Sequence, residues 1–136
     1  MGGIRNYQDI IAWQKSMDLA AMVYGTTKLF PKDELYGLTQ QMRKAAVSVS
    51  SNIAEGWGRG TTGDYLRFLR MARGSLCELE TQIHLSQRLG YLTPANAQEP
   101  LNGVAECKKV LQGLIGSVER QQAQNHATRN DNHGEW

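Results

Sequence analysis

Six cationic side chains gather in one short stretch of the chain, and their type and spacing could do chemistry. Between residues 35 and 77 only two carboxylates, Glu55 and Asp64, oppose them. Lysine and arginine neutralise phosphate groups and release bound counterions, so such a set can follow a nucleic-acid backbone. The predicted phosphate contacts are Arg43, Lys44, Arg59, Arg67, Arg70 and Arg73.

The same charges have a second interpretation, which is a solvated helical surface with internal ion pairs. Arg73, for example, is placed to pair with Glu55 or Glu80. The net charge of +2 is modest and does not by itself indicate a nucleic-acid partner. Few base-reading groups accompany the cations, so binding would depend little on nucleotide sequence.

Catalytic, metal-binding and cofactor-binding patterns are not found in the sequence. No histidine has a spacing typical of metal ligands, and no nucleophile motif occurs. A site built from Asn52, Glu55 and Arg73 would lack a nucleophile or a metal. We therefore expect a protein that is not an enzyme and holds no metal or cofactor. The histidines, which we expect at the surface or in the tail, are His84, His126 and His133.

The glycine-rich run GWGRGTTG at residues 56–63 precedes a predicted helix. It follows a helix instead of a strand and lacks the Lys-Ser/Thr ending of a phosphate-binding loop. The run therefore predicts a turn, with an occasional phosphate contact as the alternative.

Cysteine usage and hydropathy bear on location. Cys77 and Cys107 lie on separate predicted helices, which favours free buried thiols over a disulfide framework. The start of the chain has no long apolar segment, and no apolar run approaches the ~18 residues of a membrane span. We expect a cytoplasmic protein that does not cross a membrane.

Four helical patterns must position these residues. Short connections make successive helices antiparallel, so the predicted fold is all-α, an antiparallel up-down-up-down four-helix bundle. We expect one domain over residues 1–120 and a disordered tail over 121–136, which lacks periodicity. The predicted helices run from Asp9 to Leu29, from Glu34 to Gly56, from Thr62 to Leu89, and from Pro94 to about residue 120.

Helices one and two each carry two small or apolar faces, and a helix of this kind is usually buried on both sides. We expect the second faces to pack between subunits of a homo-oligomer. Helix three has one regular seam, from Tyr65 to Ser86. The first face of helix one consists of Ile10, Trp13, Met17, Ala20, Tyr24 and Thr27, and its second face of Ala12, Leu19, Met22 and Val23. The second face of helix two consists of Lys44, Val47, Ser51 and Ala54.

Polar residues interrupt the core seam of helix two. Asn52 stands at a core-type position, with Ser48 and Glu55 near its edge. Buried polar groups must find partners, so these residues are predicted to fix the register of the helix.

Three runs carry a resemblance to a known family: IIAWQKSMDLAAMVYGTTKLFPKDE, LYGLTQQMRKAAVSVSSNIAEGWGR and YLRFLRMARGSLCELETQIHLSQRLGYL. Over about residues 7–92 the chain resembles the bacterial four-helix-bundle proteins encoded in 23S ribosomal RNA intervening sequences. The resemblance extends to the accessory proteins of diversity-generating retroelements. It implies a ring-like homopentamer and a basic surface for nucleic acid and a reverse transcriptase.

Carried over by position, the family's helix-two motif falls on Arg43, Arg59 and a set of small or polar residues that we predict to be structural. We thus expect a non-catalytic oligomeric accessory protein that binds RNA or DNA, or a ribonucleoprotein, through basic helix surfaces. The alternative is a structural or protein-interaction module that binds no nucleic acid. The predicted structural motif is Gln41, Ser48, Asn52, Glu55 and Gly56 on helix two, with Ser75 and Glu78 on helix three.

Overall fold

The computed structural model describes the backbone of residues 4–134 and the side chains of residues 4–130. Within this part, no helix combines the length and the apolar character needed to cross a membrane. The elements are η1 (Tyr7–Asp9), α1 (Ile11–Thr27), η2 (Lys32–Glu34), α2 (Leu38–Gly58), α3 (Thr62–Arg88) and α4 (Pro94–Gly134), where η marks a 3-10 helix.

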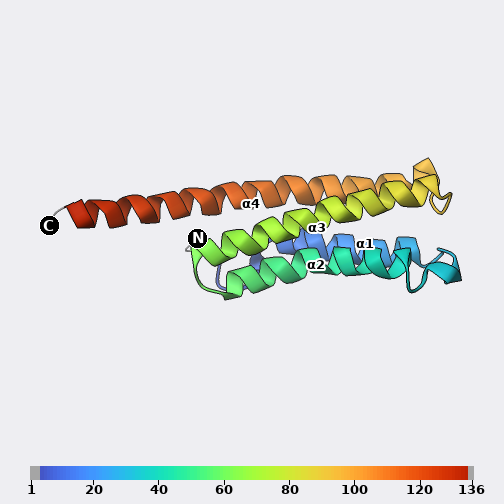
Figure 1. The fold of residues 1–136 in the computed structure, drawn as a ribbon, viewed down its shortest axis with the longest axis horizontal. Helices are drawn as coiled ribbons and strands as arrows, with labels where there is room; N and C mark the ends of the chain where they lie inside the picture. The colour runs from blue at the N-terminus through green and yellow to red at the C-terminus, as the bar shows by residue number, and fades with distance from the viewer. Residues whose placement is uncertain (1–3, 135–136) are drawn as a thin grey trace.

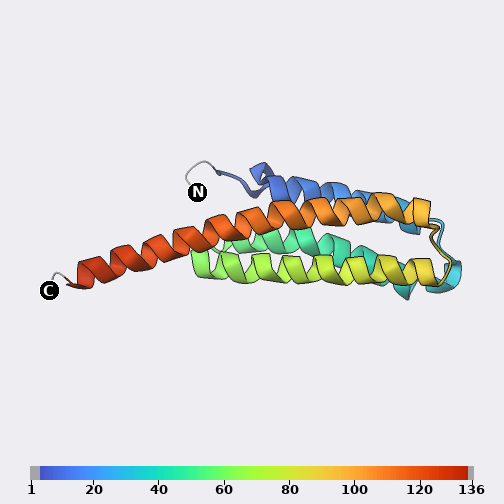
Figure 2. The same ribbon diagram turned by 90° about the horizontal axis from the view of Figure 1, so that it is seen from above.

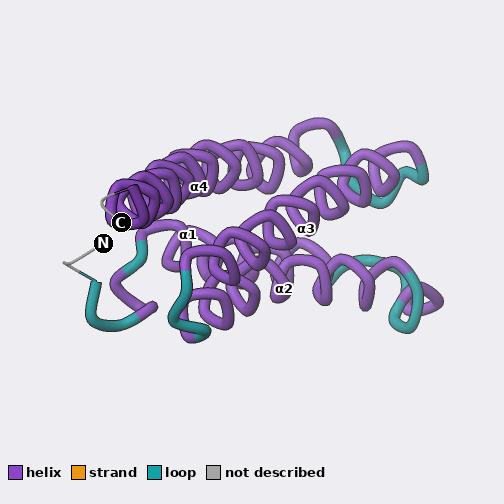
Figure 3. Tube along the Cα trace, turned by 60° about the vertical axis from the view of Figure 1, so that its left-hand side comes forward, coloured by secondary structure: helices purple, strands orange, loops and turns teal. Residues whose placement is uncertain are grey.

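The four α-helices form an elongated bundle in which successive helices run antiparallel (Figures 1 and 2). Each helix packs against the next in sequence, and α4 returns to pack against α1. Figure 3 shows the four helices side by side, with the loops at the two ends. This order confirms the predicted up-down-up-down bundle.

The core is built around the row of apolar residues on α3, the seam that the sequence predicts from Tyr65 to Ser86. Its apolar positions recur in steps of three and four, so they share one helix face and point into the bundle. Every position of the predicted seam is buried, namely Tyr65, Leu69, Ala72, Leu76, Leu79, Ile83 and Ser86.

In α1 the structure divides the two apolar faces differently from the pattern. Leu19 and Val23, expected on the second face, are buried in the core, whereas Met17 and Tyr24 of the first face are exposed. Ala12, Leu19 and Val23 line the side that contacts α2 and α4, and that contact decides which face turns inward. The periodicity of the sequence predicts two apolar faces on this helix but does not indicate which of them is buried in the core.

The second helix begins later than expected. Residues 32–34 form the separate η2 turn, and α2 starts at Leu38 with Gly37 as its N-cap. Leu35, which the predicted second helix included, is therefore exposed, and the buried residues of α2 start at Leu38.

The glycine run joins α2 to α3 in a tight corner. Gly60 has φ +84°, a left-handed conformation that side chains rarely adopt. The hydroxyl of Thr61 caps α3 by accepting a hydrogen bond from the Asp64 amide at 3.2 Å. Gly56 lies where the helices meet, because a Cβ there would stand 2.6 Å from the Cβ of Phe68.

The last helix is longer than predicted. Its start agrees with the sequence, because Thr93 caps it through the Asn96 amide at 3.1 Å and Pro94 follows. Residues 121–134, expected to be a disordered tail, continue α4 past the end of the bundle (Figure 2). The side chains of residues 123–130 are exposed. The helix extends there because elongation adds one hydrogen bond per residue to an existing helix and needs no apolar face.

Replacing Gly56 with alanine tests the close approach of α2 and α3. The added Cβ meets another Cβ, which cannot rotate away, so overpacking should cost the upper part of its usual range, about 2–3 kcal/mol. A gain of about 1 kcal/mol from helix propensity leaves a net loss of about 1–2 kcal/mol. Urea unfolding at one protein concentration measures the change. Gly74→Ala is the control, because its added Cβ meets nothing within 4 Å and should stabilise α3. Equal unfolding midpoints for Gly56→Ala and wild type would contradict the packing described here.

Candidate nucleic-acid interface

Two of the predicted phosphate-binding residues meet at the glycine corner. The guanidinium of Arg59 lies 5.0 Å from the ring centroid of Phe68, and that of Arg67 lies 4.6 Å from it. Attraction between a cation and an aromatic face favours both positions. We call Arg59, Arg67 and neighbouring Arg70 the corner arginines.

Each corner arginine also has a carboxylate neighbour. Arg59 pairs with Glu55 at 3.0 Å, Arg67 with Asp64 at 3.6 Å and Arg70 with Glu119 of α4 at 3.6 Å. These side chains are about half exposed, and exposed ion pairs contribute little to stability. The guanidinium groups can therefore leave their carboxylates at low cost when a phosphate is offered.

The remaining cations point elsewhere. Arg73 donates a hydrogen bond to Gln112 of α4 at 3.1 Å, instead of pairing with Glu55 or Glu80. Glu80 pairs with Lys108 at 2.9 Å, which raises the pKa of that lysine. The structure thus places Arg73 along the seam between α3 and α4, beside the corner arginines and not among them.

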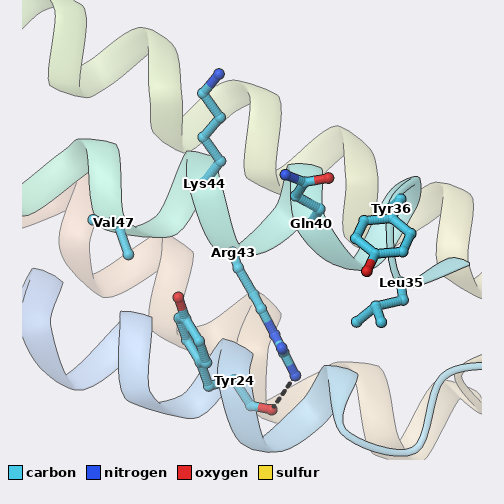
Figure 4. Close-up of a pocket in the computed structure, with 7 residues that line it drawn as sticks. All are labelled: Tyr24, Leu35, Tyr36, Gln40, Arg43, Lys44 and Val47. Carbon is cyan, nitrogen blue, oxygen red and sulfur yellow. Dashed lines mark hydrogen bonds between the residues drawn. The ribbon is translucent and has the colours of Figure 1, made fainter. Parts of the chain in front are cut away.

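Arg43 is half-buried and bridges α2 to α1. Its Nε donates to the Thr27 hydroxyl at 2.9 Å, its Nη2 donates to the Tyr24 carbonyl at 3.5 Å, and its guanidinium lies over the Tyr24 ring at 4.6 Å. Figure 4 shows Arg43 reaching across to α1 while neighbouring Lys44 points away from it. The six predicted cations therefore do not form one surface.

Around Arg43 lies an exposed, largely apolar patch with an open cavity of about 470 Å³. Tyr36 is 87% exposed and Val47 41% exposed, although both are large apolar groups. Exposed apolar side chains grouped in one place make this surface a candidate for contact with another protein. We call it the α1–α2 patch; it is lined by Tyr24, Leu35, Tyr36, Gln40, Arg43, Lys44 and Val47 (Figure 4).

On the other side of α2, the predicted motif residues line the groove against α3. The hydroxyls of Ser48 and Ser75 lie 2.9 Å apart, and Asn52 Nδ2 donates to the carbonyl and hydroxyl of Ser48 at 2.8 and 2.9 Å. Gln41 and Glu78 border a cavity of about 360 Å³ in the same groove. Asn52 therefore lies at the edge of the core, where its amide bonds within its own helix.

Sequence similarity identifies the family. A model of the family described as 23S rRNA-intervening sequence protein matches residues 8–113. The chain belongs to this family. None of the curated proteins matches it.

A solved structure has a similar fold. A crystal structure from Bacteroides thetaiotaomicron VPI-5482, described as a protein of unknown function from the S23 ribosomal protein family, resembles the chain with a TM-score of 0.71. The two are 22% identical, and the match covers 78% of this chain and 96% of the other. At this identity the similarity concerns the fold alone.

The three residues weighed as a catalytic site each bond to a different partner. Asn52 donates to Ser48, Glu55 pairs with Arg59, and Arg73 donates to Gln112 of α4. Within residues 4–134 no group of three or more His, Cys, Asp or Glu residues is arranged to hold a metal ion.

The two thiols differ, although both were expected to be buried. Cys107 is buried between α4 and its neighbours, and burial raises its pKa to about 11. Cys77 is exposed on α3, so the prediction of a buried thiol is wrong there. The seam rule explains the difference, since Cys107 follows Val104 by three residues on the core face of α4 whereas Cys77 lies off the α3 seam.

The sequence does not predict a buried glutamine on α3 or a cavity at the glycine corner. Gln82 is buried on α3 and donates to Glu78 at 3.4 Å, while its Oε1 has no hydrogen-bond partner in the described part of the chain. Trp57 and Tyr65 line a cavity of about 430 Å³ under the glycine corner, and burial raises the pKa of Tyr65 to about 12. The spacing of Gln82 four residues after Glu78 could have revealed the first feature; the second depends on how the corner folds.

Arg43→Lys tests whether this residue serves the fold. Lysine keeps the charge but cannot donate from Nε to Thr27 while stacking on Tyr24, so we expect a loss of about 1 kcal/mol in the free energy of unfolding. Lys44→Arg, the reverse exchange at the exposed neighbouring position, should change stability by less than about 0.5 kcal/mol. Thermal or urea unfolding compares the two. A stable Arg43→Lys protein with weakened nucleic-acid binding would instead assign Arg43 to the ligand.

Proposed function

We propose that this protein is a non-catalytic, homo-oligomeric accessory protein that binds nucleic-acid backbones through its corner arginines. Copies associate through the α1–α2 patch, and a pentamer is the assembly suggested by the family resemblance. The name of the family refers to 23S rRNA, so structured RNA is the first nucleic acid to test.

One observation carries the nucleic-acid part of the proposal, namely that Arg59, which follows the end of α2, and Arg67 of α3 both lie against the ring of Phe68. The aromatic ring attracts both guanidinium groups to one side chain at the corner. Arg70, three residues after Arg67 on the same helix, is placed to extend the row. Guanidinium groups suit phosphate oxygens, which accept paired hydrogen bonds.

The assembly part rests on the α1–α2 patch. Tyr36 and Val47 are exposed to water in a single subunit. Burying them against another copy would stabilise the assembly by roughly 25 cal/mol for each Å² of apolar surface removed from water. The patch also contains Gln40 and Lys44, which would lie at the polar rim that such interfaces usually have.

A second candidate function keeps the assembly and omits the nucleic acid. It is favoured by the ion pairs of the corner arginines, since Glu55, Asp64 and Glu119 balance their charge within the subunit. The protein would then be an interaction module, and the arginines would only support its surface.

Charge reversal separates the two functions. Filter binding of a structured RNA should weaken steeply with salt for the wild type, with a slope of about −0.9 in log–log form per phosphate neutralised. Arg67→Glu together with Arg70→Glu should weaken binding at least about tenfold and reduce the slope by about 2.

The matched control reverses Lys28 and Lys32, which are exposed at the opposite end of the bundle and change the net charge equally. This control should bind nearly as the wild type does. Binding that resists salt, or that survives reversal of Arg67 and Arg70, would favour the interaction module.

The patch predicts a change of mass. Light scattering of the wild type should give a multiple of the 15.2 kDa chain mass, five-fold for a pentamer. Tyr36→Ser with Val47→Asp should shift the protein toward the monomer without unfolding it, because both side chains are exposed in the subunit. Leu29→Asp, on an exposed residue outside the patch, should leave the mass unchanged. A wild-type monomer at high concentration would end the assembly proposal.

A further inference from the structure

The cavity under the glycine corner has walls that suit a flat aromatic ligand. Its volume of about 430 Å³ lies within the ~300–1,000 Å³ range of small-ligand sites. Aromatic side chains of α2 and α3 face it, and its rim is the backbone of the corner. The lining residues are Trp57, Gly58, Gly60, Thr61, Thr62 and Tyr65.

Tyr65 brings a polar group to this cavity. The residue is only 3% exposed and lines the cavity, and its hydroxyl is not among the fully buried groups that lack a partner in the described part of the chain. A phenol can both donate and accept, so a ligand with hydrogen-bonding groups on its edge would bond to it. The hydroxyls of Thr61 and Thr62 are at the same rim, although Thr61 already caps α3.

Charge around the cavity restricts the class of ligand. Arg59 lies between the lining residues Gly58 and Gly60, and its guanidinium, like that of Arg67, lies against the ring of Phe68, one turn along α3 from Tyr65. Cationic side chains beside an aromatic site are the combination that binds single-stranded nucleic acid, where bases stack and phosphates pair with arginine.

The cavity also stays open if copies associate as proposed. The α1–α2 patch is near the start of α2, whereas Trp57 is at its end. Trp57 is about 20 Å from Lys44 along the helix axis, at 1.5 Å per residue. An interface over the patch would leave the corner facing solvent.

We propose that this cavity binds an unpaired nucleobase, which stacks on Trp57 and bonds through its edge to the Tyr65 hydroxyl. The inference rests on the proposed function, because the neighbouring corner arginines would hold the phosphates of the same strand. It adds a preference for single strands, since a base inside a duplex cannot enter the cavity.

Adenosine tests the cavity without any phosphate. In proton–nitrogen NMR spectra of the full chain, adenosine at millimolar concentration should shift the indole signal of Trp57, which is assigned by its loss in Trp57→Leu. Tyr65→Phe removes only the hydroxyl, should keep the fold, and should weaken the shift severalfold. An unchanged Trp57 signal at saturating adenosine would overturn the base site, whatever the arginines do.

Oligonucleotides then separate this inference from the proposed function. A twelve-residue oligoadenylate should bind more tightly than its duplex with oligouridylate. Trp57→Leu should reduce single-strand affinity at least about fivefold and leave duplex affinity unchanged. Trp57→Phe, which keeps an aromatic ring, should retain most of the preference.

The remaining outcomes are distinct. Equal binding of both nucleic acids, unaffected by Trp57→Leu in a folded protein, would overturn the base site and keep the backbone contacts. Binding of adenosine with no binding of either oligonucleotide would overturn the proposed function and keep the cavity as a nucleoside site.

Discussion

The close approach of α2 and α3 is the constraint on which the rest of the structure depends. At Gly56 the two helices leave no room for a Cβ, since it would lie 2.6 Å from Phe68. The same contact holds Phe68 where Arg59 and Arg67 can lie against its ring. Farther along, the small hydroxyls of Ser48 and Ser75 touch at 2.9 Å. Small residues therefore set the helix spacing, and the spacing sets the corner.

The sequence predicts the fold well because the core positions repeat. The seven seam positions of α3 needed only a periodicity of three and four residues, and the cap of α4 at Thr93 acts locally. Periodicity fails where two faces are alike, as in α1, since only contact with α2 and α4 decides that Val23 turns inward. Periodicity also fails to predict the end of α4, because the last part of this helix has no apolar face.

The candidate site was harder to predict, because a cation's role depends on what surrounds it. Arg43 and Lys44 are neighbours in sequence, yet one bridges to Thr27 and the other points to solvent. Arg73 was expected near Glu55 or Glu80 but reaches Gln112, which is on a helix that no local rule connects to it. Spacing identifies which residues are charged, whereas the partner helices determine which charges remain available.

In the proposed function, the start of α2 contacts other copies of the chain and the end of α2 binds phosphates. The two contacts can form at the same time because they lie far apart along the helix. Copies that meet at the α1–α2 patch would each keep a glycine corner exposed, so one assembly would present several arginine pairs. A single corner, with its charges partly balanced by Glu55 and Asp64, offers weak attraction to a phosphate backbone. Several glycine corners on one oligomer would bind the same nucleic-acid strand together, and such multivalent binding raises the overall affinity by orders of magnitude. A net charge of only +2 per chain is thus compatible with tight binding, provided that the chain assembles.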